Sequence, residues 1–149
     1  MLGELSISEI EALLHRNVIG RVGMQADGKV YVVPITYVYD GGTVLGHTTE
    51  GLKIELLRKN PHCCFEVDEV KSIAAWQSVI AWGRFEELSG NEAAIAMEKL
   101  SARLLPLSPG ETSYPARMGP TASGRISTQT GNSIVYKIEL AEKTGRYER

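Results

Sequence analysis

The sequence predicts a mainly β protein, an antiparallel barrel with appended helices. Short runs rich in β-branched and aromatic residues recur along the chain, and turn residues such as Asp27-Gly28 and Asp40-Gly41-Gly42 separate several of them. Only a few segments space their apolar residues at helical intervals. Six strands, several at hairpin spacing, with few helices are typical of a small barrel.

Length and composition are those of an ordinary soluble domain. The 149 residues fit one domain over 1–149, with 43% hydrophobic and 23% charged residues. The net charge of −2 gives no indication of a nucleic-acid-binding surface. The N-terminal residues include acids and no long apolar run, and no segment reaches the roughly 18 apolar residues of a membrane span. We therefore expect a cytoplasmic protein with neither a nucleic-acid nor a membrane partner.

The first element is a helix over 7–16. Ser6 and Glu9 have capping-box spacing, and apolar residues follow at helical intervals. This helix is expected to pack on the main body. A first strand follows over 18–24.

Two hairpins come next. Asp27-Gly28 predicts a two-residue turn into a strand over 30–39. Pro34 interrupts that run and removes one ladder donor, so an edge, a bulge or a break is expected there. A third strand is expected over 43–48, after the next glycine turn.

The second half of the chain contains longer strands and a long connection. The expected elements are a helix over 51–59, a strand over 62–67, a loop over 68–72, a strand over 76–88, a helix capped by Ser89 and Glu92, and a last strand over 133–140. Gly83 is expected to bend its strand. The stretch 106–127 is dense in Pro, Gly, Ser and Thr and predicts a long loop, and 143–149 is expected to be a polar tail.

The segment from Gly46 to Lys53 carries the clearest indication of chemistry. The free N–H groups of a first helical turn and the helix dipole favour an anion. Thr48 and Thr49 add hydroxyl donors, Gly51 adds a flexible backbone, and Lys53 adds a positive charge. Together they suit a phosphate monoester. The alternative is that Thr49 only caps the helix and Lys53 is solvated.

Other familiar chemistries are absent from the sequence. We find no dinucleotide, P-loop, zinc-protease or serine-hydrolase motif. The histidines His15, His47 and His62 lack metal-ligand spacing, and no metal site is predicted. Cys63 and Cys64 are adjacent in an apolar run and are expected to be buried core thiols without a redox role.

The order of motifs resembles a known family. Val32-Val-Pro-Ile-Thr-Tyr-Val-Tyr-Asp40 precedes Gly46-His-Thr-Thr-Glu-Gly-Leu-Lys53, then Leu56-Leu-Arg-Lys-Asn-Pro61, Cys64-Phe-Glu-Val-Asp68 and Trp76-Gln-Ser-Val-Ile-Ala-Trp-Gly-Arg-Phe-Glu-Glu-Leu88. This arrangement resembles the pyridoxamine phosphate oxidase-like, flavin-binding split-barrel superfamily, and its His-Thr-Thr-Glu-Gly-Leu-Lys segment is most similar to the nitroimidazole-resistance branch. The resemblance covers roughly residues 15–105 and the last strand.

The resemblance implies a six-stranded split barrel that forms a homodimer, with flavin mononucleotide (FMN) in each interface cleft. By position, the phosphate belongs to Thr48, Thr49, Gly51 and Lys53, and the backbone of Val33, Pro34, Ile35 and Thr36 lies along the isoalloxazine ring. Trp76, Gln77 and Ser78 match the segment with which the partner subunit approaches the flavin. His47 matches a histidine beside the flavin; it is either catalytic or a strand-end histidine bonded to backbone.

The resemblance also limits the expected activity. True pyridoxamine phosphate oxidases have a C-terminal segment with a tryptophan and arginines, whereas this segment reads Thr144-Gly-Arg-Tyr-Glu-Arg149 and contains no tryptophan, so oxidation of vitamin B6 is not expected. The expected function is FMN-dependent oxidation or reduction with a small-molecule electron donor and a small organic acceptor, nitroaromatic or quinone-like by resemblance. The alternative is a non-catalytic flavin, deazaflavin or haem carrier or sensor. Tyr114, Arg117 and Met118 in the 106–127 loop are candidates for a lid or substrate wall.

Overall fold

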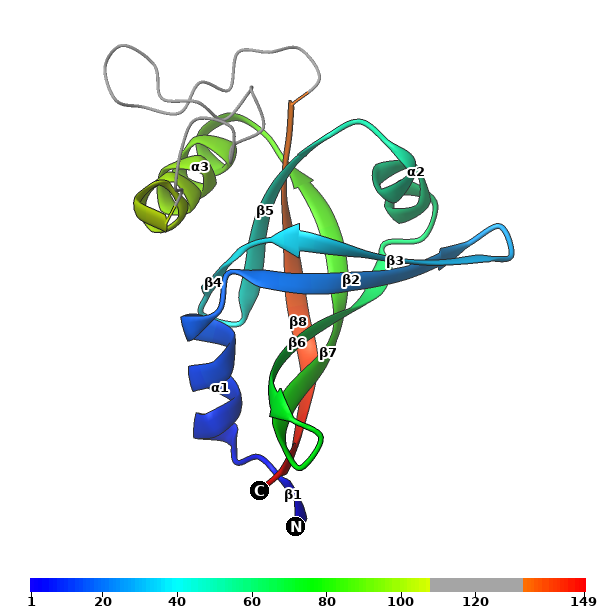
Figure 1. The fold of residues 1–149 in the computed structure, drawn as a ribbon. Helices are drawn as coiled ribbons and strands as arrows, with labels where there is room; N and C mark the ends of the chain where they lie inside the picture. Colours follow the sequence, from blue (N-terminus) through cyan, green and yellow to red (C-terminus); the bar gives the residue numbers. More distant parts are fainter. Residues whose placement is uncertain (108–132) are drawn as a thin grey trace.

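The structure, a computed structural model, describes residues 1–107 and 133–149. Within them, eight strands form one antiparallel sheet with helices packed around it (Figure 1). The strands are β1 (Leu2–Glu4), β2 (Ile19–Ala26), β3 (Lys29–Thr36), β4 (Val38–Asp40), β5 (Thr43–Thr49), β6 (His62–Ser72), β7 (Ala75–Leu88) and β8 (Ser133–Glu148). The helices are α1 (Ile7–Arg16), α2 (Leu52–Lys59) and α3 (Gly90–Leu104), with a 3-10 turn at Leu105–Leu107. No helix of the described residues is long and apolar enough to cross a membrane.

The strand order shows how the sheet is curled. The order is β3-β2-β6-β7-β8-β5-β4, with β1 paired to β8. Strands β3 and β4 stand at opposite ends of this order yet follow one another in the chain, so the sheet must bend until its ends approach. Figure 1 shows β2 and β3 crossing in front of β6, β7 and β8. The sheet is not closed, and the predicted mainly β split-barrel class is confirmed.

Both short hairpins turn where the sequence predicts. Asp27 and Gly28 have φ angles of 52° and 74°, which is the pair of positive values that matches the twist of flanking strands. Gly41 and Gly42, with φ angles of 54° and 88°, join β4 to β5 in the same way. These turns set the register of the strands that lead to the site.

The main core fills the inside of the barrel. Its largest fully buried side chains are Tyr37, Tyr136 and Phe65, and the rings of Tyr37 and Phe65 meet edge to face at 4.9 Å between centroids. A second, smaller core lies outside the barrel, where α3 covers one face of β5 and β8. Its buried members are Leu45, Ala96, Met97, Leu100 and Val135. Strand β5 is therefore packed on both faces, which holds its C-terminal end in place.

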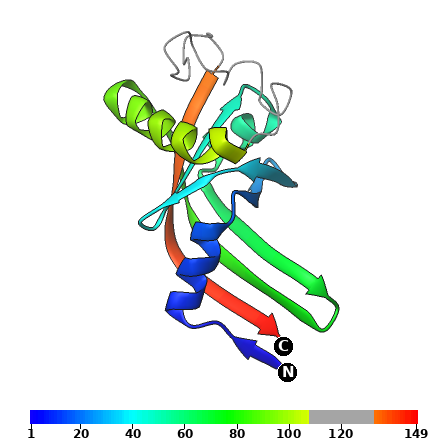
Figure 2. The ribbon, with the colours of Figure 1, turned by 60° about the vertical axis from the view of Figure 1, so that its left-hand side comes forward.

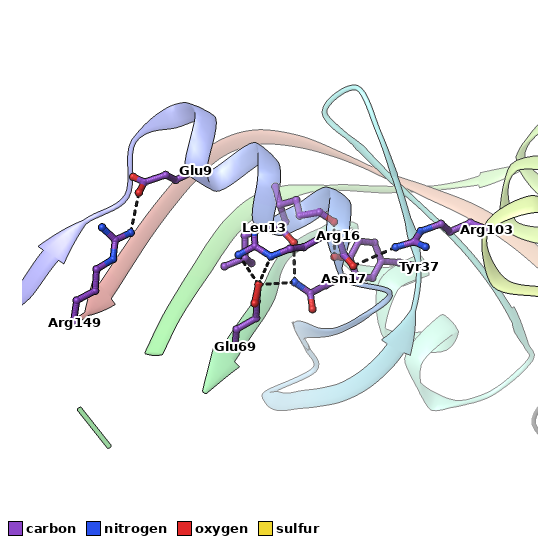
Figure 3. Close-up of polar contacts among 9 residues, drawn as sticks. Glu9, Leu13, Arg16, Asn17, Tyr37, Glu69, Arg103 and Arg149 are labelled. Atoms are coloured by element: carbon purple, nitrogen blue, oxygen red, sulfur yellow. Dashed lines mark hydrogen bonds and ion pairs between the residues drawn. The ribbon is translucent and has the colours of Figure 1, made fainter. Parts of the chain in front are cut away.

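Helix α1 begins and ends as predicted. The Ser6 amide donates to the Glu9 carboxylate at 2.8 Å, and the Glu9 amide donates to the Ser6 hydroxyl at 3.3 Å, so the predicted capping box is present. The buried side chains of this helix are Ile10, Leu13 and Leu14. At its C-terminal end, Arg16 and Asn17 donate to Glu69 of β6 at 2.6 and 3.2 Å (Figure 3). These contacts anchor α1 to the barrel. Figure 2 shows α1 from another side, beside the strands.

Two strands extend further than predicted. The expected loop 68–72 continues β6, and the expected polar tail 143–149 continues β8 as far as Glu148. Both extensions pair with the first half of β7. Backbone groups make the hydrogen bonds between the strands, so polar side chains do not prevent a segment from joining the sheet. The two segments are polar because many of their side chains are exposed, and their polarity does not indicate a loop or a tail.

The interruption of the predicted strand 30–39 falls at a different residue. Pro34 lies inside β3, opposite Arg21, and marks an edge strand rather than a break. The break comes at Tyr37, whose buried hydroxyl donates to the Leu14 carbonyl at 2.7 Å.

Three further expectations concern the second half of the chain. The bend at Gly83 is confirmed as a register shift between β7 and β8. The capping box at Ser89 is wrong: that side chain makes no cap bond, and the left-handed backbone of Gly90, with φ of 58°, departs from the geometry that the box needs. Most of the 106–127 loop, with Tyr114, Arg117 and Met118, lies outside the described residues.

Candidate functional site

An open seam runs between strands β3 and β5. Strand β3 pairs with β2 along one edge, and no described strand pairs with its other edge. Strand β4 pairs only with Thr43–Leu45, so residues 46–49 of β5 have β8 as their one described partner. Strands β3 and β5 contact each other. Backbone donors and acceptors are thus available on both sides of the seam for a ligand with polar edges.

The β3 side of the seam contains the predicted residues 33–36. Ile35 is buried and Val33 half-buried, while Pro34 and Thr36 are exposed, as alternation along a strand requires. A flat ligand along this edge would meet backbone and small side chains. The prediction that Pro34 lies in an edge strand therefore agrees with the structure.

The β5 side ends in the start of helix α2. Thr48 and Thr49 are the last residues of β5, Gly51 is the N-cap of α2, and Lys53 lies in its first turn. No side chain caps this helix, and the Thr48 hydroxyl donates instead to the Thr49 carbonyl at 3.3 Å. The alternative in which Thr49 caps the helix is therefore wrong, and the first-turn N–H groups are not occupied by a side-chain cap.

Lys53 is a half-buried cation. Burial lowers the pKa of its ammonium below the ordinary 10.5, and the structure gives it no carboxylate partner among residues 1–107 and 133–149. The alternative of a fully solvated surface lysine is thus excluded. A partly desolvated charge without a counter-ion is costly, and an anionic ligand would offset that cost.

Glu50 is held by the end of the same helix. Arg58 donates from Nη1 and Nη2 to the two oxygens of Glu50 at 2.9 and 2.7 Å, a bidentate pair. The Nε of Arg58 donates to Glu87 near the end of β7. No sequence pattern predicts a role for Glu50 or Arg58. Their spacing of eight residues across a helix start provides no helical i, i+4 signal that could have indicated the pair.

His47 is oriented by a partner that the sequence did not indicate. Its Nε2 shares a hydrogen bond with the hydroxyl of Ser133, the first residue of β8, and its Nδ1 is buried without a partner in the described chain. Burial lowers the pKa of this histidine below 6.5. A charged ring would leave a buried N–H unpaired, so the neutral form is favoured at neutral pH. Its hydrogen bond goes to a side chain, not to backbone.

Trp76, Gln77 and Ser78 lie far from this site within one chain. On β8, Ser78 is opposite Arg146, whereas Thr49 is opposite Ser133. Thirteen residues of strand, from 133 to 146, separate the two positions, which is about 40 Å along the strand. Figure 1 shows the β6–β7 turn near the chain termini and α2 at the other end. One chain alone does not bring these three residues to the seam.

An apolar groove lies on the outer face of β2, β3, β6, β7 and β8. Its volume is about 710 Å³, and its wall includes Val30, Val32, Cys64, Trp82 and Leu140. Val30, Val32 and Trp82 are 75%, 62% and 42% exposed. Such a surface on one face of a small barrel is larger than scattered exposed residues produce, and it is typical of an interface.

The two cysteines differ from the expected pair of buried thiols. Cys63 is buried, and burial raises the pKa of its thiol to about 12, which keeps it protonated. Cys64 is only half-buried, because neighbours in a strand point to opposite faces, and both cysteines line the apolar groove. No group of metal-binding side chains is found in the part of the chain that the structure describes.

Comparison with protein families shows to which family the chain belongs. A family model described as pyridoxamine 5'-phosphate oxidase matches residues 6–147. The chain belongs to this family. Among curated proteins, an uncharacterized protein of Rhizobium meliloti (strain 1021) is 28% identical over 142 residues, which is 95% of this chain and 92% of the relative.

Solved structures share the fold. An FAD-binding protein from Mesorhizobium loti is 28% identical, with a TM-score of 0.74 over 100% of this chain and 99% of the other. A candidate 5-nitroimidazole antibiotic resistance protein from Bacteroides thetaiotaomicron superposes with a TM-score of 0.70 at 20% identity, over 99% of this chain and 87% of that one. Both the pyridoxamine 5'-phosphate oxidase family and the split-barrel fold predicted from the sequence are therefore confirmed.

Proposed function

We propose that this protein binds a flavin nucleotide and uses it to transfer electrons to a small organic acceptor. The observation that carries the proposal is Lys53, a half-buried ammonium at an uncapped helix N-terminus with no carboxylate partner in the described residues. The phosphate attached to the ribityl chain of a flavin would be the negatively charged partner of Lys53. Thr48, Thr49 and Gly51 complete the phosphate end with hydroxyl and backbone donors.

The ring of the flavin is proposed to lie along the seam. The unpaired edge of β3 at Val33–Thr36 offers N–H and C=O groups to the polar edge of an isoalloxazine, and no strand competes for them in the described residues. His47, neutral and fixed through Ser133, is proposed to stand beside the ring. It would position a substrate or exchange a proton with it.

Two flavin nucleotides fit this proposal. FMN ends in the phosphate that Lys53 suits, and it is our first candidate. FAD carries the same riboflavin phosphate within a pyrophosphate, and the 28% identical relative from Mesorhizobium loti is an FAD-binding protein. Titration of the apo-protein with each nucleotide separates the two, because FAD binding requires space for the adenosine beyond the phosphate.

We further propose that the working form is a homodimer. The apolar groove provides a surface for a second copy. Trp76, Gln77 and Ser78 cannot reach the seam of their own chain, and the same three residues from a partner subunit would complete it. Dimerisation and flavin binding are then linked, since each seam lacks part of its wall in a lone chain.

When bound, a flavin supplies the electron transfer, and the protein determines its position and the access of substrate. The proposed substrate class, a small organic acceptor that is nitroaromatic or quinone-like, follows from the likeness to the candidate 5-nitroimidazole resistance protein. The competing function is a flavin carrier without turnover. Bleaching of bound flavin by NADH or NADPH, followed by reoxidation with such an acceptor, supports the enzyme; no bleaching with either donor supports the carrier.

The experiment that tests the phosphate site is Lys53→Ala, with FMN and riboflavin titrated into the apo-protein by fluorescence. Charge-assisted hydrogen bonds contribute about 1.5–3 kcal/mol, equivalent to roughly a 10- to 150-fold loss of FMN affinity. Riboflavin lacks the phosphate, so its weaker binding should hardly change. Lys59→Ala, in the same helix but paired with Asp27, is the matched control. Equal losses for FMN and riboflavin would mean that Lys53 acts through the fold.

A further inference from the structure

A carboxylate lies inside the segment that forms the phosphate end of the site. Glu50 stands between Thr49 and Gly51, the two residues that bring the chain from β5 to the N-terminus of α2. A free carboxylate there would repel a phosphate dianion and would offset part of what Lys53 contributes. An anion site with this sequence therefore needs a cation that neutralises the carboxylate of Glu50.

Arg58 supplies the positive charge that pairs with Glu50, and it does so through two hydrogen bonds of defined geometry. Two parallel N–H···O bonds, at 2.9 and 2.7 Å, join its guanidinium to Glu50, and its Nε reaches Glu87 on β7. The hydrogen bonds that Arg58 donates to Glu50, followed by the one that it donates to Glu87, raise the pKa of Arg58, so it stays charged. The pairing links the phosphate segment, the last turn of α2 and the end of β7.

The other charges on the helix are arranged differently. Lys59 pairs with Asp27 in the β2–β3 turn at 2.6 Å, away from Glu50, and Glu55 is exposed on the helix surface. Lys53 lies in the first turn of α2 and has no carboxylate partner among the residues that the structure describes. Within α2, Arg58 is thus the cation that the structure pairs with Glu50.

We propose that Arg58 is a positioning residue for the flavin phosphate: it neutralises Glu50 and holds the 49–51 segment so that the first turn of α2 and Lys53 face a phosphate. This inference rests on the proposed function, because it concerns the same site. It assigns the ligand chemistry at that end as a phosphate dianion and names a residue that acts without touching the ligand. Arg58 acts through Glu50.

The test is a charge cycle at the two positions, with the apo-protein titrated by FMN and riboflavin. Arg58→Gln leaves Glu50 unneutralised, and FMN affinity should fall roughly five- to tenfold, the scale of one uncompensated charge near a dianion at a partly exposed site. Riboflavin affinity should change less than about twofold on the same scale. Glu50→Gln should keep or raise FMN affinity, and the double variant should return to within about twofold of Glu50→Gln alone.

Conservative and matched controls separate charge from general structure. Arg58→Lys retains the positive charge and should recover most of the FMN affinity. Lys59→Gln removes one positive charge from the same turn of α2, but Lys59 does not pair with Glu50. FMN affinity should therefore remain within about twofold of the wild type. The loss in Arg58→Gln should also shrink as salt is added.

The outcomes distinguish this inference from the proposed function. If the wild type binds FMN but Arg58→Gln weakens FMN and riboflavin equally, or the double variant stays as weak as Arg58→Gln, the role of Arg58 is overturned while flavin binding stands. If the wild type binds neither flavin, the proposed function is overturned and the role of Arg58 falls with it.

Discussion

At the scale of single residues, burial changes what a polar side chain can do. His47 and Lys53 are adjacent to the same seam, and in both burial lowers the pKa. For Lys53 this creates a cation that lacks a counter-ion in the described chain. For His47 it creates a neutral ring, held by Ser133, whose protonation is opposed by the fold.

His47 should make stability depend on pH in one direction. Its pKa in the folded protein lies below the ordinary 6.5, so the unfolded chain takes up the proton first as pH falls. The contribution is fully present above pH 6.5 and decreases as pH drops below it toward the folded pKa. Urea unfolding of the apo-protein at pH 7.5 and about 5.5 should therefore show a smaller pH effect in His47→Gln than in the wild type.

His62→Gln is the control for the loss of a histidine, because that side chain is exposed. A His47→Gln variant that keeps the full pH dependence of the wild type would contradict the assignment of this effect to His47.

At the scale of elements, strand β5 connects the core to the site. Gly46 precedes His47 and faces Tyr136 of β8, and a Cβ at this position would overlap the tyrosine ring. Tyr136 is fully buried beside Phe85, with ring centroids 5.4 Å apart, so it has little room to move. The glycine at this position is explained by packing inside the barrel.

Gly46→Ala should destabilise the protein by about 1–3 kcal/mol through overpacking. Gly51→Ala is the matched variant, because a Cβ there meets nothing within 4 Å and no positive φ is required. Thermal or urea unfolding of the two apo-proteins measures the difference. Equal stability of both variants would show that the barrel accommodates the methyl group without cost.

At the scale of the whole molecule, the site and the apolar groove point to the same assembly. The seam contains the proposed phosphate end and the β3 edge, whereas Trp76–Ser78 lie about 40 Å away along β8. The groove of 710 Å³ offers apolar surface for a second copy. Two copies arranged so that each supplies Trp76–Ser78 to the other would cover the groove and complete both seams.

Val32→Glu should therefore convert the dimer to a monomer and release the flavin at the same time. The charge would be placed in the apolar groove and buried without a partner on association. Ile7→Glu, at an 80% exposed position of α1 outside the groove, is the control and should change neither property. Sedimentation at micromolar concentration, with absorbance followed at a flavin wavelength, measures both. A wild type that sediments only as a 16.3 kDa species would rule out the dimer.

Most of the elements could be predicted from local patterns. The capping box at Ser6, the Asp27-Gly28 turn and the helix that begins after Gly51 are set by interactions between near neighbours, and all are present. The capping box predicted at Ser89 failed locally, because of the backbone of Gly90. Two other predictions failed because the outcome depended on distant partners. The segments 68–72 and 143–149 are polar, but pairing with β7 makes them strands.

By itself, the sequence determined the family, the mainly β class and the residue types at the proposed phosphate end of the candidate site, because these depend on local periodicity, turn chemistry and motif order. Only the tertiary structure decided that Lys53 is half-buried, that Ser133 holds His47, that Arg58 pairs with Glu50 and that Trp76–Ser78 lie at the far end of the same chain. Burial and charge pairing depend on which strands and helices pack together, and that packing joins residues that no local pattern relates. The sequence therefore sets which side chains are present at the candidate site, and the fold sets their burial and their hydrogen-bond partners.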